Sequence, residues 1–171
     1  MNKLIIPVII ILAAVSRLIP HPPNFTPIIA MGLFSGAYIQ NRSLAVLIPI
    51  GSMFLADLFL GLHGTIYFVY GSVLLVAVLS MVLIKKVTLR NCALAALSGS
   101  FLFFIITNFG VWLSSSYYPK NIEGILICYT MALPFFGNTL VGSLFYSTVM
   151  FGGYELFLRS VAQSAPESLQ K

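Results

Sequence analysis

The sequence predicts an all-α protein, a polytopic membrane bundle of six transmembrane helices, from three observations. The chain of 171 residues is 59% hydrophobic and only 8% charged, with a mean hydropathy of +1.01, whereas soluble domains carry about 25% charged residues. Its apolar residues gather in six stretches separated by short polar connections. Its basic residues are unevenly distributed among those connections. So much apolar surface cannot be hidden in a soluble core, so we expect lipid to be the solvent.

Six segments are predicted to be helical and to cross the membrane. They run over residues 4–19, 27–39, 44–62, 66–84, 92–113 and 135–158. The second is short for a crossing, which needs about 20 apolar residues, so it is expected to be little tilted, bent or surrounded by protein. A further apolar stretch, 125–133, is too short to span. We expect it to form an interfacial or re-entrant helix, or part of a long lid.

No repeat or second domain is evident, so residues 1–159 are interpreted as a single transmembrane domain and 160–171 as a polar cytoplasmic tail. The first residues also fit a cleavable signal peptide, since Lys3 precedes an apolar run that ends at small residues such as Ala13 and Ala14. Pro7 near the start, and the lack of a following soluble domain, favour a retained first helix.

The positions of the basic residues predict the orientation of the bundle. With six crossings, one side receives seven of the nine Lys and Arg residues, namely Lys3, Arg42, Lys85, Lys86, Arg90, Arg159 and Lys171. The other side receives only Arg17 and Lys120. Because cytoplasmic loops carry the excess of basic residues, both termini are expected in the cytoplasm. The protein is expected to be a multi-pass protein of the inner (cytoplasmic) membrane. The net charge of +5 is then explained by basic cytoplasmic loops beside the lipid bilayer, and it does not indicate binding of nucleic acid.

Most polar residues of the apolar segments then fall near the outer side, where we expect a solute-binding site. The candidate residues are Arg17, His21, Asn24, Asp57, His63, Asn108, Trp112 and Asn138. Trp112, Tyr117 and Tyr118 would supply stacking surface and a lid. The chain has no nucleotide-binding motif and no nucleophile-and-base set, so we expect a protein that is not an enzyme and has no cofactor.

Asp57 is the most informative single residue, because it is the only acid within the apolar part of the first five segments. An ionisable side chain at membrane depth faces the bundle interior and has a partner. Arg17 is the expected partner, since both residues lie toward the outer boundary. Three roles remain open: a buried ion pair that locks two helices together, contact with a ligand or ion, and proton coupling.

A proline-rich connection follows the first segment. Pro20, Pro22, Pro23 and Pro27 fix backbone angles and remove amide donors, which makes the connection stiff. It is expected either to form one wall of the site, through His21 and Asn24, or to be a tight turn near lipid.

Small residues mark the second segment, where Gly32 and Gly36 form a G-x-x-x-G pattern extended by Ala30. Such residues let helices approach closely. The pattern fits either internal packing or docking of a partner helix, such as a transmembrane coupling subunit.

Residues 134–139 read as a helix breaker followed by a helix start. Amides at such a start can receive an anionic or carbonyl group, with Asn138 beside them; ordinary capping explains the same residues. His21 and His63 are poorly spaced for a metal, so no metal site is predicted. Glu155 and Arg159, four residues apart, are expected to form a helix-end ion pair.

Several motifs resemble an uncharacterised family of small prokaryotic membrane proteins: R-L-I-P-H-P-P-N-F-T-P-I-I-A at 17–30, D-L-F-L-G-L-H at 57–63, Y-P at 118–119, Gly124, and P-F-F-G-N-T at 134–139. More coarsely, N-F-T-P at 24–27, Gly32/Gly36 and Ala56-Asp57 resemble the substrate-binding S components of energy-coupling-factor vitamin transporters. That resemblance implies six helices, an outward-facing pocket, a coupling subunit with ATPases, and uptake of a vitamin or metal-related micronutrient. A cobalamin-type solute, with Cys128 or a histidine facing cobalt, is one such solute.

The sequence therefore predicts a membrane protein that binds a small solute from the outside and delivers it inward. The alternative is a non-catalytic accessory or structural subunit of a larger membrane complex, with the G-x-x-x-G face as its interface. Neither interpretation identifies the solute.

Overall fold

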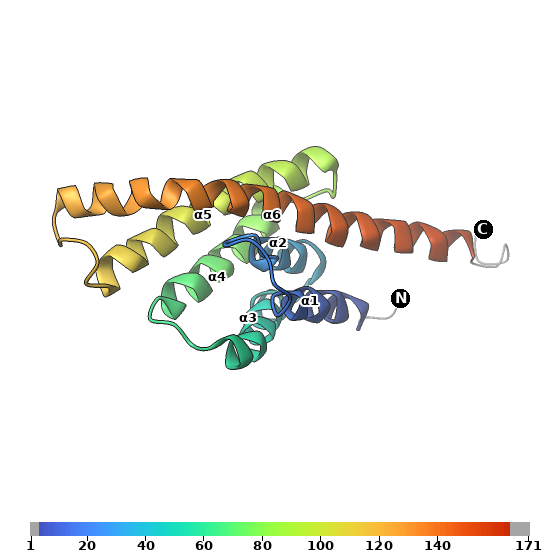
Figure 1. Cartoon of the computed structure of the whole chain (residues 1–171). Helices are drawn as coiled ribbons and strands as arrows, with labels where there is room; N and C mark the ends of the chain where they lie inside the picture. Colours follow the sequence, from blue (N-terminus) through green and yellow to red (C-terminus); the bar gives the residue numbers. More distant parts are fainter. Residues whose placement is uncertain (1–3, 165–171) are drawn as a thin grey trace.

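The computed structural model describes residues 4–164, and every regular element in that part of the chain is an α-helix. The helices are α1 (Ile5–Ser16), α2 (Ile28–Tyr38), α3 (Arg42–Leu60), α4 (Ile66–Leu83), α5 (Leu89–Ser114) and α6 (Ile122–Gln163). They form one bundle in which consecutive helices run in alternating directions (Figure 1). The all-helical prediction is confirmed, and the first five helices lie within a few residues of the predicted segments.

The last helix differs from the prediction. Residues 122–163 form a single helix of 42 residues, with Pro134 inside it. The stretch 125–133 is therefore not a separate helix. It is the start of α6 and packs along the end of α5, where the Tyr129 hydroxyl donates to the carbonyl of Ile105 at 2.6 Å. The break that the sequence predicts at Pro134 does not occur, because a proline within a membrane helix is tolerated where neighbouring groups satisfy the backbone it frees.

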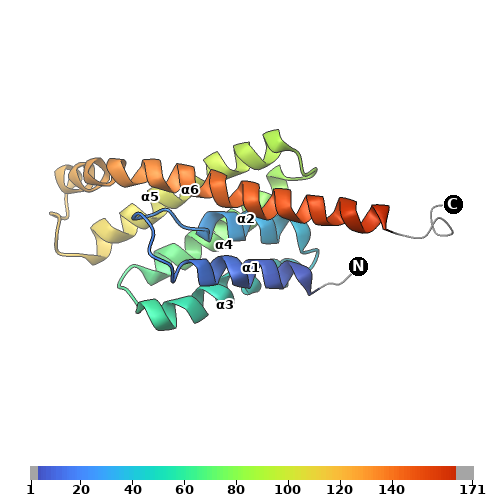
Figure 2. The ribbon, with the colours of Figure 1, turned by 45° about the vertical axis from the view of Figure 1, so that its right-hand side comes forward.

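α2 occupies the centre of the bundle and contacts the five other helices (Figures 1 and 2). Nine of its eleven residues, from Ile28 to Gly36, are buried. A helix this short leaves irregular backbone at both ends at depth, which a membrane protein tolerates only where protein or a cavity surrounds it. Of the three explanations for its shortness, enclosure by protein is the one observed.

The small residues of α2 serve internal packing. A Cβ built on Gly36 would lie 2.2 Å from the backbone oxygen of Ala77, and one on Gly32 would lie 3.3 Å from that of Val73, so both glycines face α4. Ser80 on α4 donates a hydrogen bond to the carbonyl of Leu33 at 2.5 Å. Of the two interpretations of Ala30, Gly32 and Gly36, internal packing is the one observed, because helices of this chain cover all three.

The surface and the lengths of the helices indicate a membrane protein. Four helices, α3 to α6, are long and apolar enough to cross a membrane, while α1 and α2 are apolar but shorter. Large apolar side chains such as Leu47, Phe59 and Phe101 are exposed on the outside of the bundle. A soluble protein rarely presents so much contiguous apolar surface.

Charged residues divide between the two ends of the bundle. α1 begins and α6 ends at the same end (Figure 2), and we call it the basic end. It carries five of the seven Lys and Arg residues of the described chain, namely Arg42, Lys85, Lys86, Arg90 and Arg159. Arg17 and Lys120 lie at the opposite end. The helix α6 includes the first four residues of the predicted tail, and 165–171 lie outside the described residues.

Candidate solute-binding cavity

A cavity of about 420 Å³ opens at the end of the bundle opposite the basic end. It contains five of the eight predicted site residues, contributed by α5 and by the α1–α2 and α3–α4 connections. Those five are Arg17, His21, Asn24, His63 and Asn108. The remaining lining residues are Thr26, Ile28, Ile29, Thr65, Val69, Phe103, Thr107, Val111 and Thr139. Nine of the fourteen lining residues are polar, so the cavity is more polar than most small-molecule sites, which are lined mainly by apolar side chains.

Arg17 and Asp57 form the ion pair expected from the sequence. Arg17 follows the last residue of α1, and its Nη2 lies 2.7 Å from Oδ1 of Asp57 on α3. The other carboxylate oxygen, Oδ2, accepts a hydrogen bond from the Tyr70 hydroxyl of α4 at 2.8 Å. The Asp57 side chain is only 1% exposed and does not line the cavity. The expected pairing of Arg17 with Asp57 is therefore confirmed, and Asp57 orients the Arg17 side chain from outside the cavity lining.

One nitrogen of Arg17 remains without a partner. The side chain is 10% exposed, and its Nη1 atom is buried with no hydrogen bond inside the described part of the protein. Leaving a buried donor of a charged group unsatisfied is costly. Arg17 is also one of the residues that line the cavity.

The proline-rich connection forms one wall of the cavity, as one of the two expectations stated. Asn24 has a positive φ of 63°, a left-handed conformation that asparagine tolerates better than most residues. The amide of Phe25 donates to the carbonyl of Pro22 at 3.0 Å. The Phe25 ring packs against Phe145 of α6 at 5.6 Å between ring centroids. These contacts hold His21 and Asn24 on the cavity side.

Substitutions of Asn24 test the left-handed conformation of the connection that forms this wall. Glycine adopts positive φ without strain, so Asn24→Gly is expected to remove the amide and change the free energy of unfolding by only a few tenths of a kcal/mol. A β-branched side chain disfavours this φ, so Asn24→Val is expected to lower the free energy of unfolding by about 1–3 kcal/mol. Unfolding in mixed detergent micelles measures both. Equal stability of the two variants would contradict the strained conformation.

Asn138 has a different role from the predicted one. No helix begins there, since α6 is continuous through residues 134–139. Its side-chain amide donates instead to the carbonyl of Pro23 at 2.9 Å, so it fastens the proline-rich connection to α6. Asn138 does not line the cavity, and its neighbour Thr139 does.

Three polar side chains on α5 and α6 donate hydrogen bonds to their own helices, and the Asn108 amide keeps a second donor. Thr107, Asn108 and Thr139 each donate to the carbonyl four residues back, on Phe103, Phe104 and Phe135 respectively. Hydroxyls bonded in this way present lone pairs to a ligand. Sequence reasoning did not select Thr65, Thr107 or Thr139. Their proximity in sequence to His63, Asn108 and Asn138 was the available signal.

Trp112 lies outside the cavity, contrary to the expectation. Its indole N–H donates to the carbonyl of Pro119 at 2.9 Å. The Lys120 ammonium lies 5.6 Å from the centre of the Trp112 ring and donates to the carbonyls of Trp112 and Ser115. These contacts hold the α5–α6 connection against the end of α5. Neither Tyr117 nor Tyr118 lines the cavity.

The histidines and cysteines do not assemble a metal site in the part of the chain that the structure describes, where no three His, Cys, Asp or Glu residues cluster. Nδ1 of His21 lies 3.0 Å from the carbonyl of Pro22, and Nδ1 of His63 lies 3.0 Å from the Thr65 hydroxyl. Cys128 is buried beside the carbonyl of Asn108.

Comparison with known proteins supports the first of the two resemblances. The sequence profile of a family of unknown function (DUF6580) matches residues 1–166. The chain belongs to this family. Membership in DUF6580 confirms that an uncharacterised family accounts for most of the sequence. No curated protein and no solved structure matches the chain.

Proposed function

We propose that this DUF6580 protein is a membrane solute-binding protein that takes up a small molecule through the cavity beside Arg17. The observation that carries the proposal is the cavity itself, where Arg17, whose buried Nη1 has no hydrogen-bond partner within residues 4–164, lies with four other polar residues selected from the sequence. Asp57 and Tyr70 orient the guanidinium before any ligand arrives. Such preorganisation lowers the entropy lost on binding.

The polar groups of the cavity favour a particular kind of solute. Arg17 offers a donor, which suits a carboxylate or carbonyl oxygen. Thr107 and Thr139 offer lone pairs, which suit N–H or O–H groups of the same molecule. The apolar residues Ile28, Ile29 and Phe103 would cover a flat or aliphatic part.

The size of the cavity argues for a small solute. Its volume of about 420 Å³ lies at the lower end of the range of about 300–1,000 Å³ for ligand pockets. A single-ring vitamin or a comparable nutrient fits this space. A corrin with its side chains is much larger, so the cobalamin-type solute is the less favoured choice.

We further propose that the protein crosses the inner membrane six times, with both termini in the cytoplasm. This orientation places the basic end inside, as the excess of Lys and Arg there favours, and opens the cavity outward. The likeness to S components adds a coupling subunit with ATPases as the energy source. The accessory-subunit alternative loses its proposed interface, because α4 covers Gly32 and Gly36.

The test is Arg17→Lys, which keeps the positive charge beside Asp57 but lacks the forked second nitrogen. Native mass spectrometry of gently extracted protein measures the occupancy of any co-purified solute. We expect solute on the wild type and at least about ten-fold lower occupancy in the variant, equivalent to one lost charge-assisted hydrogen bond.

Arg42→Lys, at the basic end, is the matched control and is expected to retain wild-type occupancy. Equal occupancy in Arg17→Lys and Arg42→Lys would contradict the site. A stoichiometric complex with other membrane subunits and no solute would favour the accessory role instead.

A further inference from the structure

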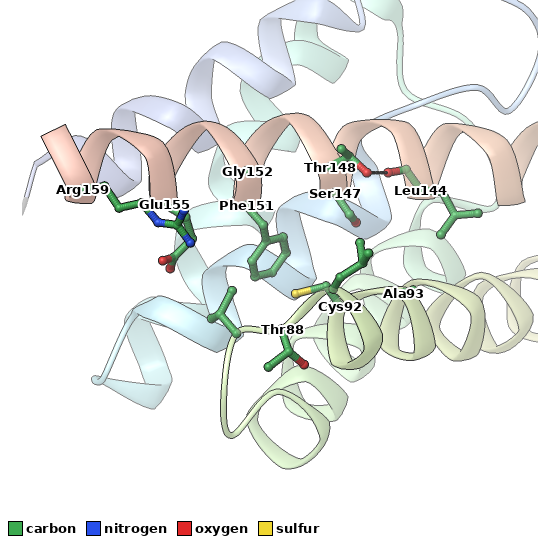
Figure 3. A pocket seen from close by; sticks show the side chains of 12 residues that line it. Thr88, Cys92, Ala93, Leu144, Ser147, Thr148, Phe151, Gly152, Glu155 and Arg159 are labelled. Carbon is green, nitrogen blue, oxygen red and sulfur yellow. Dashed lines mark hydrogen bonds between the residues drawn. The ribbon is translucent and has the colours of Figure 1, made fainter.

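A second cavity, of about 290 Å³, lies at the basic end between the start of α5 and the last turns of α6 (Figure 3). One face of α6 lines it from Leu144 to Arg159 through Thr148, Phe151 and Gly152. Cys92 and Ala93 of α5 face them from the other side (Figure 3). None of these residues belongs to the solute-binding cavity.

The dimensions describe a narrow groove. Leu144 and Arg159 are separated along α6 by about 22 Å, at 1.5 Å per residue. A volume of about 290 Å³ spread over that length leaves room for one extended chain and not for a globular solute. Half of a bilayer including its headgroups is about 20–22 Å thick, so the groove has the length of one leaflet.

The groove is apolar at its deep end and charged at its mouth. Leu144, Phe151 and Ala93 supply the apolar wall. The Ser147 hydroxyl also lies there without a hydrogen-bond partner among residues 4–164, and serines in helices can turn their hydroxyl to the carbonyl four residues back. A deep polar ligand is therefore unnecessary.

The mouth is basic. The predicted ion pair of Glu155 with Arg159 is absent, since Arg17–Asp57 is the only such pair within residues 4–164. Glu155 instead accepts a hydrogen bond from the Tyr38 hydroxyl at 2.6 Å, and Arg159 is exposed. Lys85, Lys86 and Arg90 lie in the neighbouring α4–α5 connection and at the start of α5.

We propose that this groove binds an anionic phospholipid, with one acyl chain along α6 and the phosphate at Arg159. Charge complementarity selects the headgroup, since basic pockets between membrane helices on the cytoplasmic side bind anionic lipids. The length of one leaflet and the apolar wall select the chain. The proposal is independent of the identity of the solute in the other cavity.

Two neighbouring glycines provide the experiment. Gly152 lines the groove and Gly153 does not, and a Cβ added at either meets no atom within 4 Å. Gly152→Leu therefore fills the groove, and Gly153→Leu is the matched control with the same change in composition. Native mass spectrometry of the full chain in detergent, titrated with phosphatidylglycerol, phosphatidylcholine or glycerol 3-phosphate, measures binding.

We expect the wild type and Gly153→Leu to bind phosphatidylglycerol alike, and Gly152→Leu to bind it about ten-fold more weakly, as expected for losing contact with about two methylenes. Arg159→Gln should lower the ratio of the affinities for phosphatidylglycerol and phosphatidylcholine about five-fold. Arg42→Gln should leave this ratio unchanged. Glycerol 3-phosphate should not compete, because it lacks the chain.

Three outcomes would overturn the proposal: equal lipid binding by both leucine variants, equal affinity of the wild type for the two lipids, and competition by glycerol 3-phosphate. A change of oligomeric state confined to Gly152→Leu, with lipid binding unchanged, would assign the groove to a protein helix and also overturn it.

Discussion

Asp57→Ala is expected to lower the free energy of unfolding by about 3–5 kcal/mol, because it leaves a buried guanidinium without its counter-charge. Arg17 is 10% exposed and its Nη2 is the atom bonded to Asp57; its Nη1 already has no partner. The substitution also frees the Tyr70 hydroxyl. Contacts that join α1, α3 and α4 would be lost together. Reversible unfolding in mixed detergent micelles measures the change.

The double variant Arg17→Gln with Asp57→Asn separates the charge from the packing. Removing both members of a buried ion pair is often nearly neutral, so we expect the double variant to recover most of the lost stability while losing solute binding. Glu123→Ala removes an exposed acid of α6 and is expected to change stability by less than about 0.5 kcal/mol. Additive losses in the double variant would show that the pair is not coupled.

Gly36→Ala is expected to destabilise the protein by about 1–3 kcal/mol or more, because the new methyl group meets backbone that cannot move aside. The added Cβ would lie 2.2 Å from the Ala77 oxygen and 2.8 Å from the Ser80 Cβ. Separation of α2 from α4 would also weaken the hydrogen bond from Ser80 to Leu33. Unfolding of the purified variant in micelles measures the loss.

Gly51→Ala is the matched control within another helix, α3, where a Cβ meets no atom within 4 Å. Alanine stabilises a helix interior by about 0.5–1 kcal/mol relative to glycine, so the two substitutions should change stability in opposite directions. A Gly36→Ala variant as stable as Gly51→Ala would contradict the close approach of α2 and α4.

Much of the candidate site followed from the scarcity of polar residues in apolar segments. Arg17 and Asp57 were paired from the sequence because an ionisable group at membrane depth requires a partner and few partners exist. Thr107 and Thr139 were missed, since threonines in membrane helices commonly bond to their own backbone, and only their positions beside Asn108 and Asn138 pointed to the cavity. Thr139 and Asn138 differ by one residue, yet about 100° of rotation separates them on a helix of 3.6 residues per turn.

The sequence by itself determined that this is an all-helical chain suited to lipid, with its basic residues gathered toward one end and one buried ion pair. These are consequences of local hydropathy and of the high cost of unpaired charge, both readable residue by residue. Only the tertiary structure decided that α6 continues through Pro134 and that α2 stands at the centre with its glycines against α4. It also decided which polar side chains share the cavity. Those features depend on how the helices cross, and a crossing is set by interlocking side chains from distant segments.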